Sequence, residues 1–262
     1  MEAEGGELYH SKLIGMLEAI WGTGFLSPGG PDEIARLVAG TDFTGANVLD
    51  VGCGAGGIDM ALVQNHGAAY VCGIDVEDTV LSRARELISA VNLTPRIGCL
   101  KVVPGPLPFP PDTFDIVFSK DSIVHIPDKH ALMREVFRVL KPGGRFVASD
   151  WLIGHDGTPS PEMAEYIASE GLDFGMASGK RYADAMKAAG FTDIEVVSRN
   201  EWYKETAKTE LARLKGPIGH KAASIVGQEF VDENIGIWGK MLVVLNSGEH
   251  CPTHLRARKT LS

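Results

Sequence analysis

The fold of this chain is decided by the stretch Val48-Leu49-Asp50-Val51-Gly52-Cys53-Gly54-Ala55-Gly56-Gly57. An apolar run that ends in Gly-x-Gly-x-Gly predicts a strand that turns sharply into a helix. Glycines let the backbone bend at such a turn and approach a ligand without a Cβ in the way. About one βα unit later, a second apolar run ends in Gly73-Ile74-Asp75 and predicts the neighbouring parallel strand.

Two carboxylates accompany these strands and indicate what the turn binds. Asp75 stands at the carboxyl end of the second strand, where a carboxylate accepts hydrogen bonds from both hydroxyls of a ribose, so the motifs predict a nucleoside site. A dinucleotide and S-adenosylmethionine both fit this description. Asp50 lies ahead of the glycines, where it would repel a pyrophosphate but suits the cationic amino-acid end of S-adenosylmethionine. The sequence therefore favours S-adenosylmethionine.

Alternating strand and helix patterns predict an α/β fold with a doubly wound, mainly parallel, seven-stranded sheet. The predicted strands cover 47–51, 69–75, 97–103, 114–118, 144–150, 192–198 and 253–259. The predicted helices cover 57–66, 77–91, 128–140, 160–171 and 178–189, and the region 201–247 is mostly helical. We expect one domain over residues 1–262, with N-terminal lid helices at 8–40, a cofactor-binding core at 45–200, and a helical insertion followed by the last strand at 201–262.

The composition limits the partners and the compartment. The net charge of −9 argues against binding to nucleic acid or to an anionic membrane, because both need a basic surface. The four cysteines show no Cys-x-x-Cys spacing, so we expect neither a metal site nor a disulfide framework. No run approaches the roughly 20 apolar residues of a membrane span, and the N-terminus has no signal-peptide pattern, so we expect a cytoplasmic protein. The oligomeric state stays open.

Four motifs together resemble those of the class I S-adenosylmethionine-dependent methyltransferases. They are Val48 to Gly57, Gly73-Ile74-Asp75, Leu107-Pro108-Phe109 with Phe114-Asp115, and Lys141-Pro142-Gly143-Gly144. The resemblance covers residues 25–200. It implies a Rossmann-like methyltransferase fold with S-adenosylmethionine as the cofactor.

Two further segments resemble the phosphoethanolamine N-methyltransferases within that class. One is a helix leading into Gly24-Phe25-Leu26-Ser27-Pro28-Gly29-Gly30, and the other is Ser119-Lys120-Asp121-Ser122-Ile123-Val124-His125. The resemblance places Tyr9 on the family's catalytic tyrosine and His125 on its partner histidine. In the family these two residues form a latch over the substrate and help to move the proton from the amine. Asp121 would orient the substrate amine.

The same resemblance implies a set of cofactor-binding residues. They are Leu26, Ser27, Asp50, Gly52, Gly54, Asp75, Val76 and Lys120. Asp50 would face the amino group of the cofactor, and Asp75 would face its ribose. The family's aspartate near the adenine amino group has no counterpart, because the local sequence is Val103-Pro104-Gly105-Pro106. We therefore expect backbone and packing to hold the adenine.

The expected substrate pocket departs from that family. Where the family grips a phosphate with tyrosines, an arginine and a lysine, this chain has Leu17, Trp151, Leu172, Phe174 and Met241. Each position has lost its cation or hydroxyl, and an unpaired phosphate dianion buried there would be costly. We therefore expect another small acceptor. Trp151 and Phe174 offer ring faces to a methylated ammonium or sulfonium, an attraction of roughly 0.5–2 kcal/mol each.

These patterns predict methyl transfer to a small polar metabolite, at the amine nitrogen of an ethanolamine-like or glycine-like acceptor. One alternative is S-methylation of a thioether or thiol amino-acid derivative such as a methionine-like compound, in which case the latch only positions the acceptor. A non-enzymatic alternative is a catalytically silent cofactor-binding subunit. Methylation of nucleic acid is disfavoured by the acidic charge, and because Ser119-Lys120-Asp121-Ser122 stands where a base-flipping enzyme has a Pro-Pro-aromatic signature.

Overall fold

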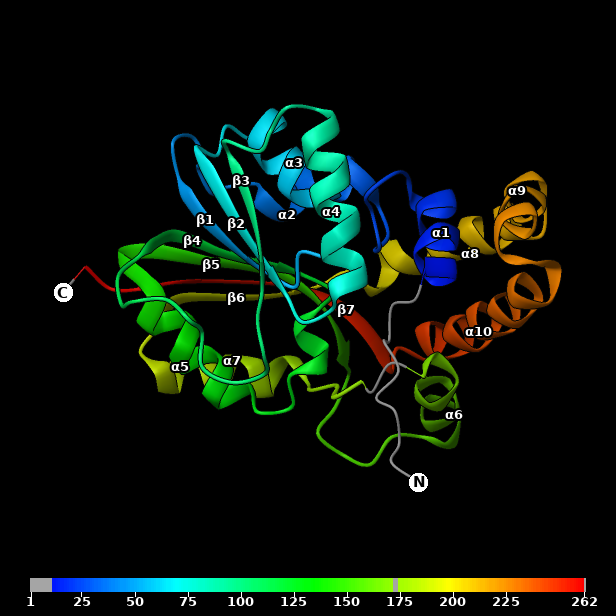
Figure 1. Ribbon diagram of the computed structural model, residues 1–262. Coiled ribbons are helices and arrows are strands. Elements are labelled where there is room, and N and C mark those ends of the chain that lie inside the picture. Colours follow the sequence, from blue (N-terminus) through cyan, green and yellow to red (C-terminus); the bar gives the residue numbers. More distant parts are fainter. Residues whose placement is uncertain (1–10, 172–173, 262) are drawn as a thin grey trace, which may run out of the picture.

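The computed structural model describes residues 11–171 and 174–261, and its centre is a seven-stranded sheet (Figure 1). The strands are β1 (Asn47–Val51), β2 (Tyr70–Asp75), β3 (Ile97–Lys101), β4 (Phe114–Lys120), β5 (Leu140–Ile153), β6 (Thr192–Ser198) and β7 (His250–Arg258). Their order is β3-β2-β1-β4-β5-β7-β6. The first five in this order run parallel, and β7 lies antiparallel between β5 and β6. The prediction of a doubly wound, mainly parallel sheet is confirmed.

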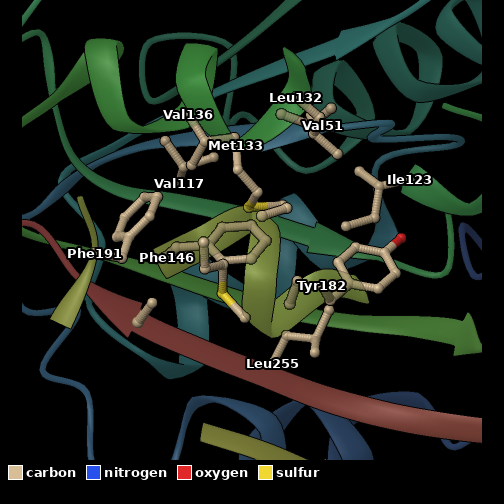
Figure 2. Close-up of a cluster of buried hydrophobic side chains, with 14 of the residues drawn as sticks. Val51, Val117, Ile123, Leu132, Met133, Val136, Phe146, Tyr182, Phe191 and Leu255 are labelled. Carbon is tan, nitrogen blue, oxygen red and sulfur yellow. The ribbon is translucent and has the colours of Figure 1, made fainter. Parts of the chain in front are cut away.

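Helices cover both faces of the sheet, because successive residues of a strand point to opposite sides. They are α2 (Gly30–Val38), α3 (Gly57–Asn65), α4 (Asp78–Ala90), α5 (Lys129–Val139) and α7 (Gly179–Ala189). Val117 and Phe146 belong to the core under α5 and α7, and their neighbours Phe118 and Val147 belong to the core under α2, α3 and α4. Figure 2 shows the first of these cores, with Tyr182 of α7 at one end.

A separate group of helices packs at one end of the sheet, and we call it the helical cap. It consists of α1 (Ser11–Trp21), α6 (Pro161–Glu170), α8 (Asn200–Leu214), α9 (Pro217–Val226) and α10 (Gln228–Ser247). These helices share a third buried cluster, which also includes Ile153 at the carboxyl end of β5, and the partly buried Trp151 packs against it. Figure 1 shows α1, α8, α9 and α10 gathered to one side of the sheet. The mostly helical character predicted for 201–247 is therefore confirmed.

The predicted bounds of two strands were too short. The fifth strand begins at Leu140 rather than at residue 144 and continues to Ile153, and the last strand begins at His250 rather than at residue 253. Leu140 pairs with Phe114 across an irregularity in the β4–β5 ladder, so the strand starts as soon as α5 ends. The other extensions arise because β5 and β7 pair continuously from Ile153 opposite His250. Local sequence patterns contain no information about such a partner.

The arrangement places one edge of the sheet beneath the cap. The carboxyl ends of β1, β2, β4 and β5 meet there, and the amino end of β7 joins them because it runs the opposite way. A short 3-10 helix, η1 (Ile123–His125), follows β4 at this edge. Among the helices of the described residues, none is both long enough and apolar enough to cross a membrane.

Candidate active site

A cavity of about 660 Å³ opens at the carboxyl ends of β1, β2 and β4. Its wall contains the glycine turn after β1, the loop after β3, η1 and the start of α5. Residues 24, 26 and 27, from the connection between α1 and α2, form a further side. Of the predicted site residues, Leu26, Ser27, Gly52, Gly54, Asp75, Val76, Lys120, Asp121 and His125 line this cavity. Ligands of doubly wound sheets bind at this edge.

The glycine turn is held against the end of β2. Gly52 has φ +80°, and its N–H donates to the Ile74 carbonyl at 2.8 Å. A Cβ added to Gly52 would lie 1.6 Å from the Oγ of Ser122, so no other residue fits without moving the loop after β4. The Gly54 N–H donates to the Asp75 carboxylate at 3.0 Å. The turn therefore presents backbone rather than side chain to the cavity.

Asp75 is oriented by the backbone around it. Its carboxylate also accepts from the Glu77 N–H at 3.1 Å. Burial raises the pKa of Asp75, and the hydrogen bonds from Glu77 and Gly54 partly offset that effect. A carboxylate fixed in this way at the end of the second strand is suited to accept hydroxyl groups of a ligand.

Asp50 lies beneath the glycine turn and not in the cavity wall. The residue is 1% exposed and neighbours Asp59 of α3, which is also buried. Burial raises the pKa of Asp50 to about 7, and it raises the pKa of Asp59 well above its usual range. Two ionised carboxylates in such a site repel each other, so the charge of Asp50 also raises the pKa of Asp59. The predicted contact between Asp50 and a cofactor amino group stays a prediction.

Lys120 and Asp121 form a buried ion pair at the end of β4. The Lys120 Nζ lies 2.5 Å from the Asp121 carboxylate and donates to the Ser27 Oγ at 2.9 Å. Asp121 has φ +56° and accepts from the Ser149 Oγ at 2.9 Å. Non-glycine residues in this left-handed region are concentrated at functional sites. The ion pair with Asp121 thus neutralises the charge of Lys120.

His125 ends η1 and faces the segment that follows α6. Its ring lies 5.4 Å from that of Phe174 between centroids, and the Gly175 N–H donates to the Val124 carbonyl at 3.0 Å. The predicted partner Tyr9 and the predicted pocket residue Leu172 lie outside the described residues. The latch between Tyr9 and His125 therefore stays a prediction.

The remaining predicted pocket residues belong to the cap. Leu17, Trp151 and Met241 lie in its buried cluster, and none of the three lines the cavity. The Trp151 ring is 5.1 Å from Tyr203 and 5.2 Å from His250 between centroids. Tyr203 of this cluster interacts electrostatically with Asp121 of the cavity wall, so the aromatic cluster adjoins the site on its cap side.

Two carboxylates beside this cluster were not predicted from the sequence. Glu210 is 3% exposed and accepts from the indole N–H of Trp21 at 2.6 Å and from the Tyr203 hydroxyl at 3.3 Å. Burial raises the pKa of Glu210, and burial raises the pKa of Glu170 to about 7. Both residues sit in helical stretches whose charges suggest a solvated face. The only sequence signal was the density of tryptophans and tyrosines around them.

Comparison with known proteins defines the class. Residues 49–148 match a family model described as a methyltransferase domain. This match covers the glycine turn and the ends of β2 and β4 that surround the cavity. Together with the sheet order and the relatives described next, it shows that the chain contains a methyltransferase domain and has the fold of the class I S-adenosylmethionine-dependent methyltransferases.

Within that class, the chain is similar to phosphoethanolamine N-methyltransferases. It is 34% identical to phosphoethanolamine N-methyltransferase 1 of Arabidopsis thaliana over 235 residues, which are 89% of this chain and 46% of that protein. The chain spans about half the length of the relatives of this kind from plants. The structure of phosphoethanolamine N-methyltransferase 2 of Haemonchus contortus, in complex with phosphomonomethylethanolamine and S-adenosylhomocysteine, matches with TM-score 0.87 and 27% identity. That match covers 96% of this chain and 58% of the other.

A more distant solved structure shares the fold alone. Geranyl diphosphate C-methyltransferase from Streptomyces coelicolor matches with TM-score 0.71 at 16% identity. This match covers 87% of this chain and 77% of the other. The same scaffold therefore serves acceptors of very different chemistry, and the acceptor has to be argued from the residues of this site.

Proposed function

We propose that this chain transfers the methyl group of S-adenosylmethionine to the amine nitrogen of a small acceptor that carries no phosphate. One observation carries the proposal. A cavity with His125 in its wall adjoins a cap cluster that contains the buried Glu210, the half-buried Glu170 and aromatic rings, where a phosphate would need cations.

The cavity fits this cofactor in size and in chemistry. Its volume of about 660 Å³ is within the range of sites for ligands of this size. Gly52 and Gly54 let the chain pass close to the ligand, and Asp75 would hold the ribose hydroxyls. Val76 and Val103 supply apolar surface for the adenine. When bound, S-adenosylmethionine supplies an activated methyl group.

The charges on the acceptor side argue against a phosphate. In the described part of the chain the buried lysines are Lys120 and Lys129, and no arginine is buried. Lys120 is paired with Asp121, and Lys129 is bound to backbone carbonyls. Glu210 and Glu170 add carboxylates on the cap side. A dianion placed there would face carboxylates, whereas an ammonium would be attracted by them and by the ring faces.

His125 and Asp121 would prepare the amine. An amine reaches the site as ammonium at neutral pH and has no free lone pair until it loses a proton. An imidazole accepts a proton in this pH range, so His125 would take or relay it. Asp121 lines the same cavity and would orient the ammonium beforehand.

An acceptor panel with labelled S-adenosylmethionine tests the proposal. The panel holds ethanolamine, glycine and its N-methyl derivatives, phosphoethanolamine and methionine-like thioethers, with products identified by mass spectrometry. Product from a phosphate-free amine is expected. Turnover of phosphoethanolamine would contradict the argument from charge, and product from a thioether would replace N-methylation by S-methylation. Cofactor binding without any product would indicate a silent subunit.

Histidine variants sharpen this experiment. His125→Ala should reduce turnover of the amine about 100–10,000-fold, as expected for loss of a general base. The matched control is His130→Ala, because His130 is exposed on α5, outside the cavity wall. Equal activity of the two variants would show that His125 does not take part in the proton transfer.

A further inference from the structure

The turn that carries His125 is held from beneath by a buried lysine. Lys129 is the first residue of α5 and is 3% exposed. Its Nζ donates to the Ile123 carbonyl at 2.8 Å and to the Ile126 carbonyl at 2.6 Å, with the Val124 carbonyl at 3.5 Å. An ammonium has three N–H donors, so this one side chain can donate hydrogen bonds to all three of these backbone carbonyls.

A buried aspartate holds the same turn from the sheet. Asp150 of β5 is fully buried, and its carboxylate accepts from the Val124 N–H at 3.0 Å. The Tyr182 hydroxyl of α7 donates to the other carboxylate oxygen. Val124, the residue before His125, is therefore bonded at its N–H by Asp150 and at its carbonyl by the Gly175 N–H.

The two charges stabilise one another. Burial lowers the pKa of Lys129 to about 8, although attraction to Asp150 opposes this shift and Arg181 of α7 adds to it. Burial raises the pKa of Asp150 to about 7, opposed by Lys129 and by the Tyr182 hydroxyl and reinforced by Asp121. Burial of a charged pair is costly, and apolar residues would fill this space without that cost. Packing alone therefore does not explain why Lys129 and Asp150 occupy this space.

We propose that Lys129 and Asp150 are positioning residues that fix His125 toward the acceptor. They bond to the backbone on both sides of His125. These hydrogen bonds therefore restrict the position of the His125 Cα. Phe174 then limits the orientation of the imidazole ring. This inference rests on the proposed function, in which His125 handles the proton of the amine.

Turnover measurements test whether Lys129 acts through His125. Lys129→Met keeps the length of the side chain but removes its donors, and should lower kcat about 10–100-fold while the cofactor dissociation constant changes little. Lys129→Arg should recover part of the loss. The matched control is Lys141→Met, which breaks the half-exposed pair with Asp115 at the other end of β4. In the His125→Ala background, Lys129→Met should cost nothing further. An additive loss, or equal losses of kcat and cofactor affinity, would overturn the proposal.

A second readout is independent of turnover. The ring signals of His125, assigned by NMR in the full chain with S-adenosylhomocysteine, should shift or broaden in Lys129→Met and stay unchanged in Lys141→Met. Asp150→Ala, which removes the oxygen that accepts from the Val124 N–H, gives the same test if Lys129→Met does not fold. Unchanged His125 signals in a folded variant would overturn the positioning role. Full turnover by His125→Ala with shifted ring signals in Lys129→Met would instead refute the proposed function and leave the positioning intact.

Discussion

The Nζ of Lys120 lies 2.9 Å from the Oγ of Ser27, inside the protein. Lys120 ends β4, and Ser27 belongs to the connection between α1 of the cap and α2 of the sheet. This hydrogen bond joins the two parts of the molecule at the cavity wall, because both residues line it. Closure of the cap and binding of the cofactor are therefore expected to depend on each other.

Removing this hydroxyl tests that dependence. Ser27→Ala leaves one donor of a buried ammonium without its acceptor, which typically costs about 1–3 kcal/mol. We expect the dissociation constant of S-adenosylmethionine, measured by calorimetry, to rise about tenfold. Ser224→Ala is the control, since that hydroxyl bonds only to its own exposed helix turn. Equal affinities in the two variants would contradict the prediction.

Asp75 should be the strongest determinant of cofactor affinity. Asp75→Asn removes the charge and leaves one oxygen for the N–H groups of Gly54 and Glu77, so one of them loses its acceptor and the predicted contact with the ribose is weakened. We expect affinity to fall about 10–100-fold, the effect of one or two hydrogen bonds to a charged group. Asp78→Asn changes the same chemistry at an exposed position paired with Lys101. Similar losses of cofactor affinity in both variants would show that the change in net charge, and not the position of Asp75, causes the effect.

A glycine-to-alanine substitution should change the free energy of unfolding in opposite directions at residue 52 and at residue 236. Gly52→Ala meets the Ser122 Oγ and an unfavourable φ, and should lower the free energy of unfolding by about 2 kcal/mol or more. Gly236→Ala lies in α10 with no atom near its added Cβ, and should raise that free energy by about 0.5–1 kcal/mol. Urea unfolding measures both. A stable Gly52→Ala protein would mean that the loop after β4 moves freely.

His250 should make the stability depend on pH in a defined window. It is fully buried between Trp151 and Tyr166, and burial lowers its pKa from 6.5 to about 4. Between these values the unfolded chain binds the proton and the folded chain does not, so stability is lost as the pH falls from 6.5 toward 4. At about 1.4 kcal/mol per pKa unit, the loss is about 3 kcal/mol.

Comparison of variants isolates this contribution from other titrating groups. His250→Phe should flatten the fall of the unfolding free energy between pH 6.5 and pH 4.5, whereas His220→Phe, at an exposed position of α9, should leave it unchanged. Parallel pH curves for His250→Phe and the wild-type chain would show that His250 is protonated in the folded state.

The sequence by itself determined the central sheet and the location of its ligand site. The pattern around Gly52 and the position of Asp75 are local, since strand alternation, the glycine turn and the helix that follows depend on neighbours in the chain. Of the predicted residues in these segments, Gly52, Gly54, Asp75 and Val76 line one cavity, together with Lys120, Asp121 and His125. Parallel strands bring their carboxyl ends to a common edge, so knowledge of the strands was enough to gather these residues.

Tertiary structure decided what lies around that site. Glu210 meets Trp21 across 189 residues of chain, and Asp150 meets Val124 across 26, and neither partnership has a local signal. The burial of Asp50 beside Asp59 likewise depends on how α3 packs against β1. Charged residues read from sequence suggest solvent exposure, and only packing shows which of them are enclosed and must find partners. The cap side of the cavity and the support beneath His125 are built from such enclosed charges.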